Sequence, residues 1–368
     1  MAEQRVRVGI VGTGWWTGLE HLPGLRSRGD VEVVALCGRD PARLTALADQ
    51  HGVAGRFTDW RELVARARPD VLVIVTPNAL HHPIAMAALD AGIHVVCEKP
   101  LALDVAQARA MAARARAQGL RTLTFFTHRA VAAAAHVRHL VADGFLGRSL
   151  HASACYFSAS HLKPGKPAAW RMRRAEAGTG ALGDIGSHVV DLVRWWLGDV
   201  VKVAGQWQTV QRERGGEPVD GDEACSFLAR LENGTLAVFQ ASKLVAGRGN
   251  YQRVELFGDR ASLVYEAEPG VDATWTGRLW AGRPDRPGLE LLPLPAELTA
   301  GLDAPDAMAG RLAAYRRLTD PFFAAVRGEG GAEAGLADTP GFDDGAAVQA
   351  VLDAVARSAE RGTWEDVA

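Results

Sequence analysis

Two segments of the chain carry residues that can do chemistry together. Lys99 stands in Glu98-Lys99-Pro100 at the end of an apolar run, and His188 follows Asp184 by four residues in a glycine-rich stretch. A lysine ammonium can stabilise negative charge that develops on an oxygen. A carboxylate beside an imidazole can set the tautomer of the ring and raise its basicity, which suits proton transfer to or from a hydroxyl. Beside a nicotinamide cofactor, such a set supports hydride transfer between an alcohol and a carbonyl.

The spacing around His188 predicts a functional helix face. Asp184, His188 and Asp191 fall at i, i+4 and i+7, so one face of a helix can carry all three. The glycines that precede Asp184 allow a ligand to approach the backbone closely. Two other interpretations stay open at this point. In the first, Asp184 and His188 are metal ligands, since they have a suitable spacing, but no third ligand is evident and we predict no metal. In the second, the segment is only a helix cap with a buried histidine.

The first third of the chain alternates between strand-like and helix-like segments. Apolar, β-branched runs predict strands near residues 5–12, 31–37, 70–76, 93–97 and 121–126, with helices such as 83–91 and 104–118 between them. This alternation predicts a parallel sheet with right-handed crossovers. Ligands of such sheets bind at the carboxyl ends of the strands. The strand ends at Gly12, Gly38, Thr76 and Lys99 are therefore expected to line one crevice.

The turn after the first strand has the context of a nucleotide-binding loop. Gly12-Thr13-Gly14 follows a strand-like run and precedes a helix-like segment. The first glycine permits the tight turn, and the second lets the backbone approach a pyrophosphate at a helix N-terminus. Thr17 stands where the third glycine of the fingerprint is usual, which suggests a looser contact between helix and strand. We predict dinucleotide binding; a plain structural turn is the alternative.

The end of the second strand bears on the choice of cofactor. Folds that prefer NAD place a carboxylate there for the ribose 2′-hydroxyl, whereas an arginine accommodates the 2′-phosphate of NADP. The position holds Gly38 followed by Arg39, and a guanidinium can pair with a phosphate through two hydrogen bonds. NADP(H) is therefore favoured, while Asp40 leaves NAD(H) possible.

The second half of the chain has a different rhythm. Short strand-like runs cover 150–158, 200–210, 224–231, 235–241, 253–257 and 261–265, and their glycine-containing turns suggest an antiparallel sheet. Residues 343–361 form an amphipathic helix pattern, and residues 278–304 suggest an irregular loop or lid. We predict a Rossmann α/β domain over residues 1–127. An α+β domain with a mainly antiparallel, open-faced sheet follows over residues 128–368.

Bulk composition limits the class of partner. The formal net charge of the 368 residues is −2, which gives no global field for nucleic acid or an anionic membrane. No apolar run approaches the ~18–20 residues that span a bilayer. The four cysteines form no CxxC pair, as is typical of free thiols in a reducing compartment. We expect a cytoplasmic enzyme with no nucleic-acid or membrane partner.

Five motifs in order resemble the Gfo/Idh/MocA family of NAD(P)-dependent oxidoreductases. They are the segment from Gly9 to Gly14, Thr76-Pro77-Asn78 with His81, Glu98-Lys99-Pro100, Trp170-Arg171, and the segment from Asp184 to His188. The resemblance implies that Lys99 binds the reacting oxygen, that His188 is the general acid/base, and that Asp184 binds substrate or orients His188. It places Arg129 and Tyr156 at the substrate pocket.

The resemblance also implies a cofactor site, a substrate class and an assembly. The cofactor residues would be Gly12, Thr13, Gly14, Trp15, Trp16, Gly38, Arg39, Thr76, Pro77, Asn78, His81, Glu98, Lys99, Trp170 and Arg171. The expected substrate is carbohydrate-like, and a homodimer or homotetramer would form through the C-terminal sheet. Two other functions occur on the family's scaffold: a redox-cycling glycosidase or lyase with no net oxidation, and a non-catalytic cofactor sensor. Retention of Lys99, Asp184 and His188 together argues against the sensor.

Overall fold

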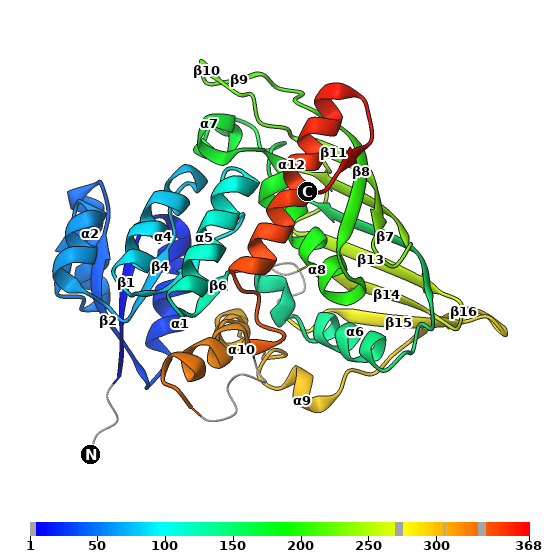
Figure 1. Cartoon of the computed structure of the whole chain (residues 1–368), viewed down its shortest axis with the longest axis horizontal. Coiled ribbons are helices and arrows are strands. Elements are labelled where there is room, and N and C mark those ends of the chain that lie inside the picture. The colour runs from blue at the N-terminus through cyan, green and yellow to red at the C-terminus, as the bar shows by residue number, and fades with distance from the viewer. Residues whose placement is uncertain (1–4, 269–274, 305, 330–335) are drawn as a thin grey trace. The chain divides into compact units, whose positions relative to one another are not determined.

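The computed structural model describes residues 5–268, 275–304, 306–329 and 336–368 (Figure 1). The chain packs as two units, Met1–Phe125 with Tyr315–Ala346, and Phe126–Ala314 with Ala347–Ala368. The boundary between residues 127 and 128 stays a prediction. That boundary leaves out one feature: residues 315–346 come late in the sequence but pack within the first unit.

The sheet of the first unit is parallel throughout. Its order is β3-β2-β1-β4-β5-β6, and every neighbouring pair is parallel. The strands are β1 (Val6–Val11), β2 (Val31–Cys37), β3 (Gly55–Phe57), β4 (Val71–Ile74), β5 (His94–Cys97) and β6 (Thr122–Thr124). The order reverses between β1 and β4, and a crevice at the carboxyl ends of the strands is expected at such a switch point. This confirms the predicted Rossmann architecture.

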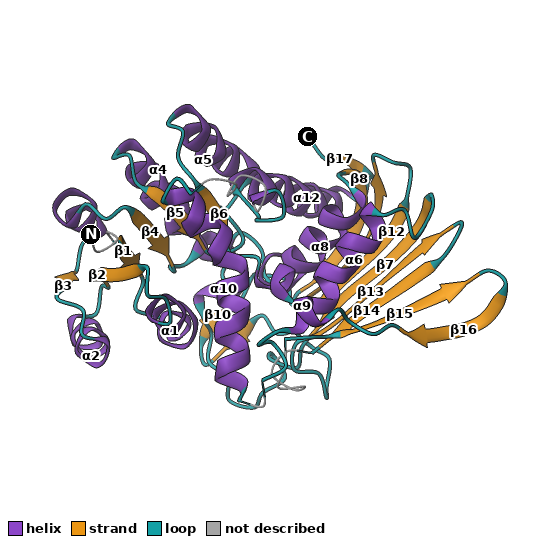
Figure 2. Ribbon diagram, turned by 90° about the horizontal axis from the view of Figure 1, so that it is seen from below, coloured by secondary structure: helices purple, strands orange, loops and turns teal. Residues whose placement is uncertain are grey.

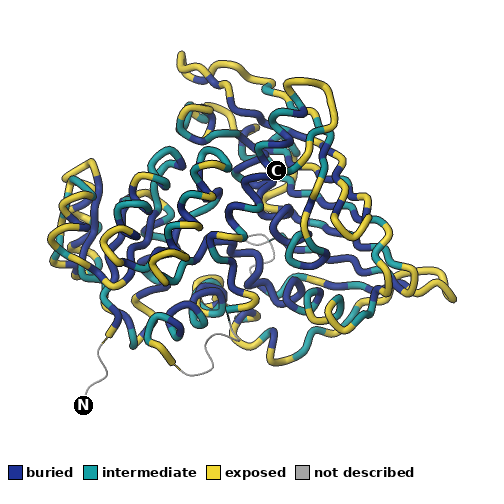
Figure 3. The backbone as a smooth tube through the Cα atoms, viewed as in Figure 1, coloured by how far each residue is buried: buried dark blue, intermediate teal, exposed yellow. Residues whose placement is uncertain are grey.

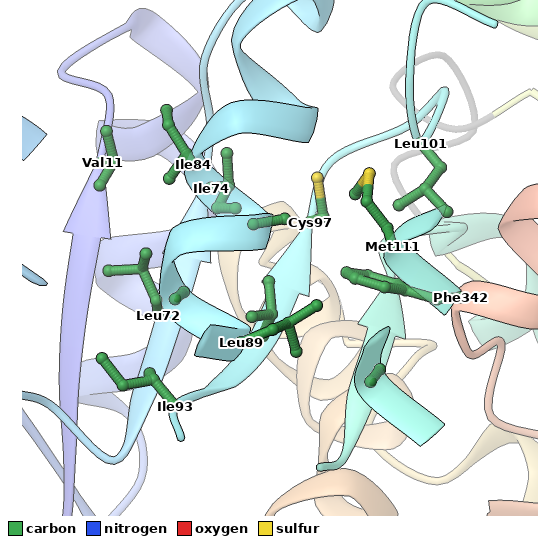
Figure 4. Packing of buried hydrophobic residues seen from close by; sticks show 14 of the residues in the cluster. Val11, Leu72, Ile74, Ile84, Leu89, Ile93, Cys97, Leu101, Met111 and Phe342 are labelled. Atoms are coloured by element: carbon green, nitrogen blue, oxygen red, sulfur yellow. The ribbon is translucent and has the colours of Figure 1, made fainter. Parts of the chain in front are cut away.

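Helices cover the first sheet because its strands are apolar on both faces. They are α1 (Leu22–Arg26), α2 (Pro41–His51), α3 (Trp60–Glu62), α4 (His81–Asp90), α5 (Val105–Ala117) and the later part of α10 (Ala307–Val326). Asp40 caps α2 and Pro41 occupies its first turn, as the sequence predicts. Figure 4 shows the resulting core, in which Ile74 and Cys97 of the strands lie near Leu89 of α4 and Met111 of α5.

Side-chain and backbone contacts hold residues 315–346 to the first unit. Arg28 forms an ion pair with Asp320, and its guanidinium carbon lies 4.5 Å from the centre of the Phe323 ring. The Thr124 backbone N–H donates to the carbonyl of Pro340 at 2.7 Å, which extends the edge of the sheet beyond β6. These contacts join segments that are far apart in the sequence.

The second unit holds a nine-stranded sheet of order β16-β15-β14-β13-β7-β12-β11-β8-β17. Its strands are β7 (Ser149–Phe157), β8 (Val200–Gln208), β11 (Ala224–Leu231), β12 (Leu236–Ser242), β13 (Tyr251–Gly258), β14 (Ser262–Ala267), β15 (Arg278–Arg283), β16 (Arg286–Leu291) and β17 (Glu365–Asp366). All neighbouring pairs are antiparallel except β7 and β12. A separate two-residue pair forms from β9 (Glu213–Arg214) and β10 (Glu217–Pro218).

One face of this sheet is covered by helices, as Figure 2 shows for α6 (Ala132–Ala142) and α8 (Ser187–Leu197). Strand β11 shows the consequence, since Phe227 is buried whereas its neighbours Ser226 and Leu228 are exposed. The shorter helices are α7 (Arg174–Ala177) and α9 (Ala296–Thr299), and α12 (Phe342–Arg361) is the last helix before β17. The predicted mainly antiparallel, open-faced sheet is therefore confirmed.

The expected irregular loop over residues 278–304 is wrong. Residues 278–291 form the β15–β16 hairpin, and α9 follows. Every residue of β16 is exposed (Figure 3), and its alternating Leu289 and Leu291 are too short a pattern to identify a strand from sequence. Pro287 also lies within it, which an edge strand tolerates because the N–H groups on its outer side have no neighbouring strand to pair with.

Within the part of the chain that the structure describes, no helix combines the length and apolar character needed to cross a membrane. All four cysteines are free thiols, and three of them are buried.

Candidate active site

The turn after β1 requires glycine at Gly12. Its φ is 120°, and a Cβ atom there would lie 2.1 Å from the carbonyl oxygen of Val75. Its N–H donates to the carbonyl of Cys37 at 2.8 Å, at the end of the neighbouring strand. A Cβ atom on Gly14 would instead meet no described atom within 4 Å. The loop is thus tightly packed at Gly12 and open at Gly14, which suits the approach of a dinucleotide pyrophosphate to the backbone.

Thr17 fixes the start of the following helix. It is buried, and its hydroxyl donates to the carbonyl of Gly12 at 2.8 Å. It begins a π-helical turn, η1 (Thr17–His21), which leads into α1. Thr17 replaces the usual third glycine with a side chain that bonds back to the loop.

Glu98 anchors this turn to the end of β5. Its Oε1 accepts a hydrogen bond from Trp16 Nε1 at 2.8 Å and lies 2.8 Å from Nε2 of the buried His21. Burial alone would raise the pKa of Glu98, but the hydrogen bond from His21 and the charges of His21 and Lys99 lower it below its ordinary value. Glu98 therefore remains an anion at the carboxyl end of the sheet, whereas Trp15 is 70% exposed.

The end of β2 bears on cofactor selectivity. A Cβ atom on Gly38 would lie 2.4 Å from Oγ1 of Thr13, so a side chain here requires Thr13 to move. The carboxylate of Asp40 caps α2, with Oδ1 accepting from two backbone N–H groups at 3.0 and 3.1 Å. Arg39 is exposed. The nearest carboxylate in the sequence is thus already engaged by the helix, while the guanidinium is open to solvent.

The end of β4 is tied to the segment after β5 by His81. This buried ring has Nδ1 3.0 Å from the carbonyl oxygen of Pro100 and Nε2 3.0 Å from that of Thr76. Burial lowers the pKa of His81, although both carbonyls oppose the shift. His81 thereby holds the loop that carries Lys99 against the loop after β4. That loop also contains Pro77 and the buried Asn78.

In the second unit, Asp184 and His188 lie on consecutive helical segments. Asp184 belongs to a π-helical turn, η6 (Leu182–Gly186), and His188 lies in the first turn of α8. Such turns are frequent at functional sites. The buried His188 ring packs edge-on against His128, with centroids 4.3 Å apart, and its centroid lies 6.0 Å from that of Tyr156. Burial raises the pKa of Tyr156, and the charge of Asp184 adds to the shift.

Asp191 and Arg129 form a buried ion pair. The Nε and Nη2 atoms of Arg129 donate to the two carboxylate oxygens of Asp191 at 2.9 and 2.6 Å. The two side chains are 3% and 1% exposed. This pairing gives both residues a role in holding α8, and the substrate role of Arg129 stays a prediction.

Lys243 is a site residue that the sequence analysis missed. It directly follows β12, and its Nζ lies 2.8 Å from Oδ2 of Asp184. Arg171 approaches the other carboxylate oxygen, with Nε 3.4 Å from Oδ1, and its guanidinium carbon lies 4.3 Å from the Trp170 ring centre. A single lysine at the carboxyl end of an alternating strand was the signal available in the sequence.

A second buried polar cluster lies beside this one. His161 Nδ1 lies 3.0 Å from Oε1 of Glu223, which also accepts from Arg214 at 2.8 Å. Burial lowers the pKa of His161 to about 4, with the charges of Lys243 and Lys166 contributing. Among the described residues, no group of three or more His, Cys, Asp or Glu side chains has the arrangement of a metal site.

Two family models match the chain. Residues 6–126 match the model described as "Oxidoreductase family, NAD-binding Rossmann fold", and residues 134–264 match the "GFO/IDH/MocA C-terminal domain".

Relatives match along most of the chain. A levoglucosan dehydrogenase from Pseudarthrobacter phenanthrenivorans is 29% identical over 357 residues, covering 89% of this chain and 87% of the relative. An uncharacterised oxidoreductase of Rhizobium meliloti is 30% identical over 364 residues, which cover 98% of this chain and 99% of that protein.

Solved structures agree with this chain over nearly its full length. An oxidoreductase domain protein from Kribbella flavida has a TM-score of 0.85 at 33% identity, over 99% of this chain and 100% of that one. A levoglucosan dehydrogenase in complex with NADH has a TM-score of 0.86 at 27% identity, over the same shares.

Proposed function

Since this chain belongs to the Gfo/Idh/MocA family of oxidoreductases, we propose that it transfers a hydride between a nicotinamide cofactor and a secondary alcohol or ketone of a sugar or polyol. The observation that carries the proposal is the Asp184 carboxylate, which is partly exposed between two cations and lies four residues before the buried His188. A carboxylate acceptor beside an acid/base imidazole suits a substrate with several hydroxyl groups.

The residues of the first unit fit a dinucleotide. Backbone at Gly14 has open space beside it, and Gly12 makes a turn that a side chain would block. When bound, the nicotinamide supplies the hydride acceptor or donor. The proposed cofactor is NADP(H), supported by the exposed Arg39 and by the engagement of Asp40 in capping α2. NAD(H) remains the alternative, since a related dehydrogenase structure contains NADH.

The chain's own residues divide the work on the reacting oxygen. In this proposal, the Lys99 ammonium stabilises negative charge on that oxygen, and the His188 imidazole accepts or returns its proton. Asp184 accepts hydrogen bonds from the substrate. Trp170 and Arg171 contact the cofactor, and Tyr156 lines the substrate pocket.

The names of the relatives support a carbohydrate substrate. They include proteins named levoglucosan dehydrogenase, D-glucoside 3-dehydrogenase and 1,5-anhydro-D-fructose reductase. All three names specify oxidation or reduction of a carbohydrate. We therefore propose a sugar or sugar derivative as the substrate of this chain. The cytoplasmic location of the protein stays a prediction.

The proposed assembly is a homodimer or homotetramer through the second sheet. Its exposed face carries apolar side chains on adjacent strands, with Leu228 of β11 opposite Val238 of β12 and Leu236 of β12 opposite His151 of β7. Such apolar surface is a feature of interfaces between subunits. Light scattering of the purified chain tests the assembly, and a monomer mass overturns it.

The function is tested by following nicotinamide absorbance with NAD⁺ and NADP⁺ over a panel of polyols, free sugars, anhydrosugars and glycosides. Sugar release from the glycosides is measured in parallel. Accumulation of reduced cofactor supports the proposal. Sugar release without net reduction overturns it in favour of the redox-cycling glycosidase, and silence in both assays overturns it outright.

A further inference from the structure

Lys243 is held from both sides by backbone hydrogen bonds. Its N–H donates to the carbonyl of Glu223 at 2.9 Å, and its own carbonyl accepts from the N–H of His161 at 3.0 Å. Its side chain is only 3% exposed. Lysine is almost never this buried unless its charge is paired. Lys243 therefore sits in a fixed position, and its ammonium group has a specific task.

The partner of that ammonium group is the candidate substrate carboxylate. Lys243 Nζ lies 2.8 Å from Oδ2 of Asp184, which is the only carboxylate within ion-pair distance of Lys243 among the described residues. Asp184 is more accessible than Lys243, at 26% exposure. The pair is thus buried at the lysine end and open at the carboxylate end.

The other charged groups around the pair act in two directions. Burial raises the pKa of Asp222, whereas the positive charge of Lys243 acts to lower it. Lys166 and His161 both have pKa values lowered by burial and by the charge of Lys243, that of Lys166 to about 8. Lys243 is thus a buried cation in this part of the unit, and so is Arg214, which is paired with Glu223 at 2.8 Å.

Two cations contact the Asp184 carboxylate, one at each oxygen. Each carboxylate oxygen offers two lone pairs. Lys243 occupies one side of Oδ2, and Arg171 approaches Oδ1 at 3.4 Å from a half-exposed position. The Asp184 side chain is 26% exposed, and this accessible part of the group can face a ligand. A carboxylate paired with two cations can still accept hydrogen bonds from hydroxyl groups.

We propose that Lys243 is a positioning residue for substrate binding: it holds the Asp184 carboxylate so that its accessible side accepts hydrogen bonds from substrate hydroxyl groups. The inference rests on the proposed function, and it assigns Asp184 to binding rather than to proton transfer. Since such hydrogen bonds form in the ground state and the transition state alike, their loss raises KM more than it lowers kcat.

The test compares three variants at one position. K243M removes the charge and the hydrogen bond, K243Q keeps a donor without charge, and K243R keeps the charge. A hydrogen bond to a charged group contributes about 1.5–3 kcal/mol, so K243M should raise KM for the sugar by about tenfold or more. Its kcat should stay within about threefold, because proton transfer at His188 is retained. K243R should recover part of the loss, and K243Q less.

Three further measurements separate positioning from a structural role. Without the neighbouring cation the carboxylate is easier to protonate, so the acid limb of kcat/KM should move to higher pH in K243M. The dissociation constant for NADPH should not change. The matched control is K202M, because Lys202 is an exposed lysine of β8 that pairs with the exposed Asp366 at 3.6 Å; its KM and pH profile should equal those of the unmodified chain.

The outcomes are distinguishable. A folded K243M with unchanged KM, or with a loss confined to kcat, overturns the inference while leaving the proposed function intact. Should K243M fail to fold, equal KM values in K243Q and K243R overturn it. An unmodified chain that turns over no sugar in the panel overturns the proposed function first, and this inference with it.

Discussion

Replacement of Asp191 by asparagine tests whether the buried pair with Arg129 is structural. The substitution is nearly isosteric and removes one charge. It leaves the Arg129 guanidinium, 3% exposed, without the anion that accepts both of its hydrogen bonds to Asp191. Desolvation makes an uncompensated buried charge far more costly than an exposed one.

The magnitude follows from that burial. Breaking a buried pair by removing one partner costs about 3–5 kcal/mol of unfolding free energy. In a domain of about 150–250 residues, each kcal/mol lowers Tm by about 2–4 °C. We therefore expect D191N to unfold on the order of 10 °C below the unmodified chain. Conversion of both residues to apolar side chains, as in R129M/D191L, should recover much of the loss.

The assay is thermal and denaturant unfolding followed by circular dichroism, with E360Q as the matched control. Glu360 pairs with Arg174 at 2.8 Å, but the two side chains are 51% and 42% exposed. An exposed pair contributes at most about 1 kcal/mol, so E360Q should shift Tm by only a few degrees. The contrast between the two amide variants isolates the effect of burial.

Two results, one from thermal unfolding and one from enzyme kinetics, would refute this reasoning. If D191N unfolds at the same temperature as the unmodified chain, the pair does not hold the unit together. If R129M keeps its stability but raises KM for the sugar, Arg129 contacts substrate, as the family resemblance implies. A stability loss with unchanged KM supports the structural role.

Three further predictions concern the cofactor and the catalytic groups. K99A or H188A should lower kcat by about 10²-fold or more with cofactor affinity retained, measured by initial rates and fluorescence titration; unchanged turnover in both contradicts the site assignment. R39A should weaken NADPH far more than NADH, and equal losses in the two titrations contradict NADP preference. Glu98 has a pKa lowered by its hydrogen bond from His21 despite burial. Its charged form therefore stabilises the fold above its ordinary pKa of 4.5, and this contribution is lost as the pH falls through the lower folded pKa. The stability gap between the unmodified chain and E98Q, from urea unfolding across pH, should shrink in that range, and a pH-independent gap contradicts the prediction.

Local patterns predicted most of the regular elements. The strands at 31–37 and 224–231 have the predicted bounds, because turn residues follow both runs, Gly38 after the first and Asn233-Gly234 after the second. The helix that begins at Pro41 does so because Asp40 caps it, a signal readable from two adjacent residues. Parallel order in the first sheet followed from the alternation of strands and helices.

Elements that depend on distant partners were not readable in this way. Strand β16 pairs only with β15 and is exposed along its length, and the alternation of Leu289 and Leu291 is too short to identify a strand from sequence. The packing of residues 315–346 with the first unit depends on contacts such as Arg28 with Asp320. An arginine far from its partner in the sequence looks like any surface arginine.

In the candidate site, too, the sequence predicted the local helix but not the distant partners of its side chains. The spacing of Asp184, His188 and Asp191 predicted a helix, and the segment is helical, but the spacing did not reveal what each carboxylate binds. Asp191 pairs with Arg129, whereas Asp184 pairs with Lys243. Because one pair is fully buried and the other is open at its carboxylate, two aspartates on the same helical segment have different capacities. Of these two aspartates only Asp184 is accessible, at 26% exposure against 1% for Asp191. Under our proposal it is therefore Asp184 that accepts hydrogen bonds from a hydroxylated ligand, and Lys243 orients it.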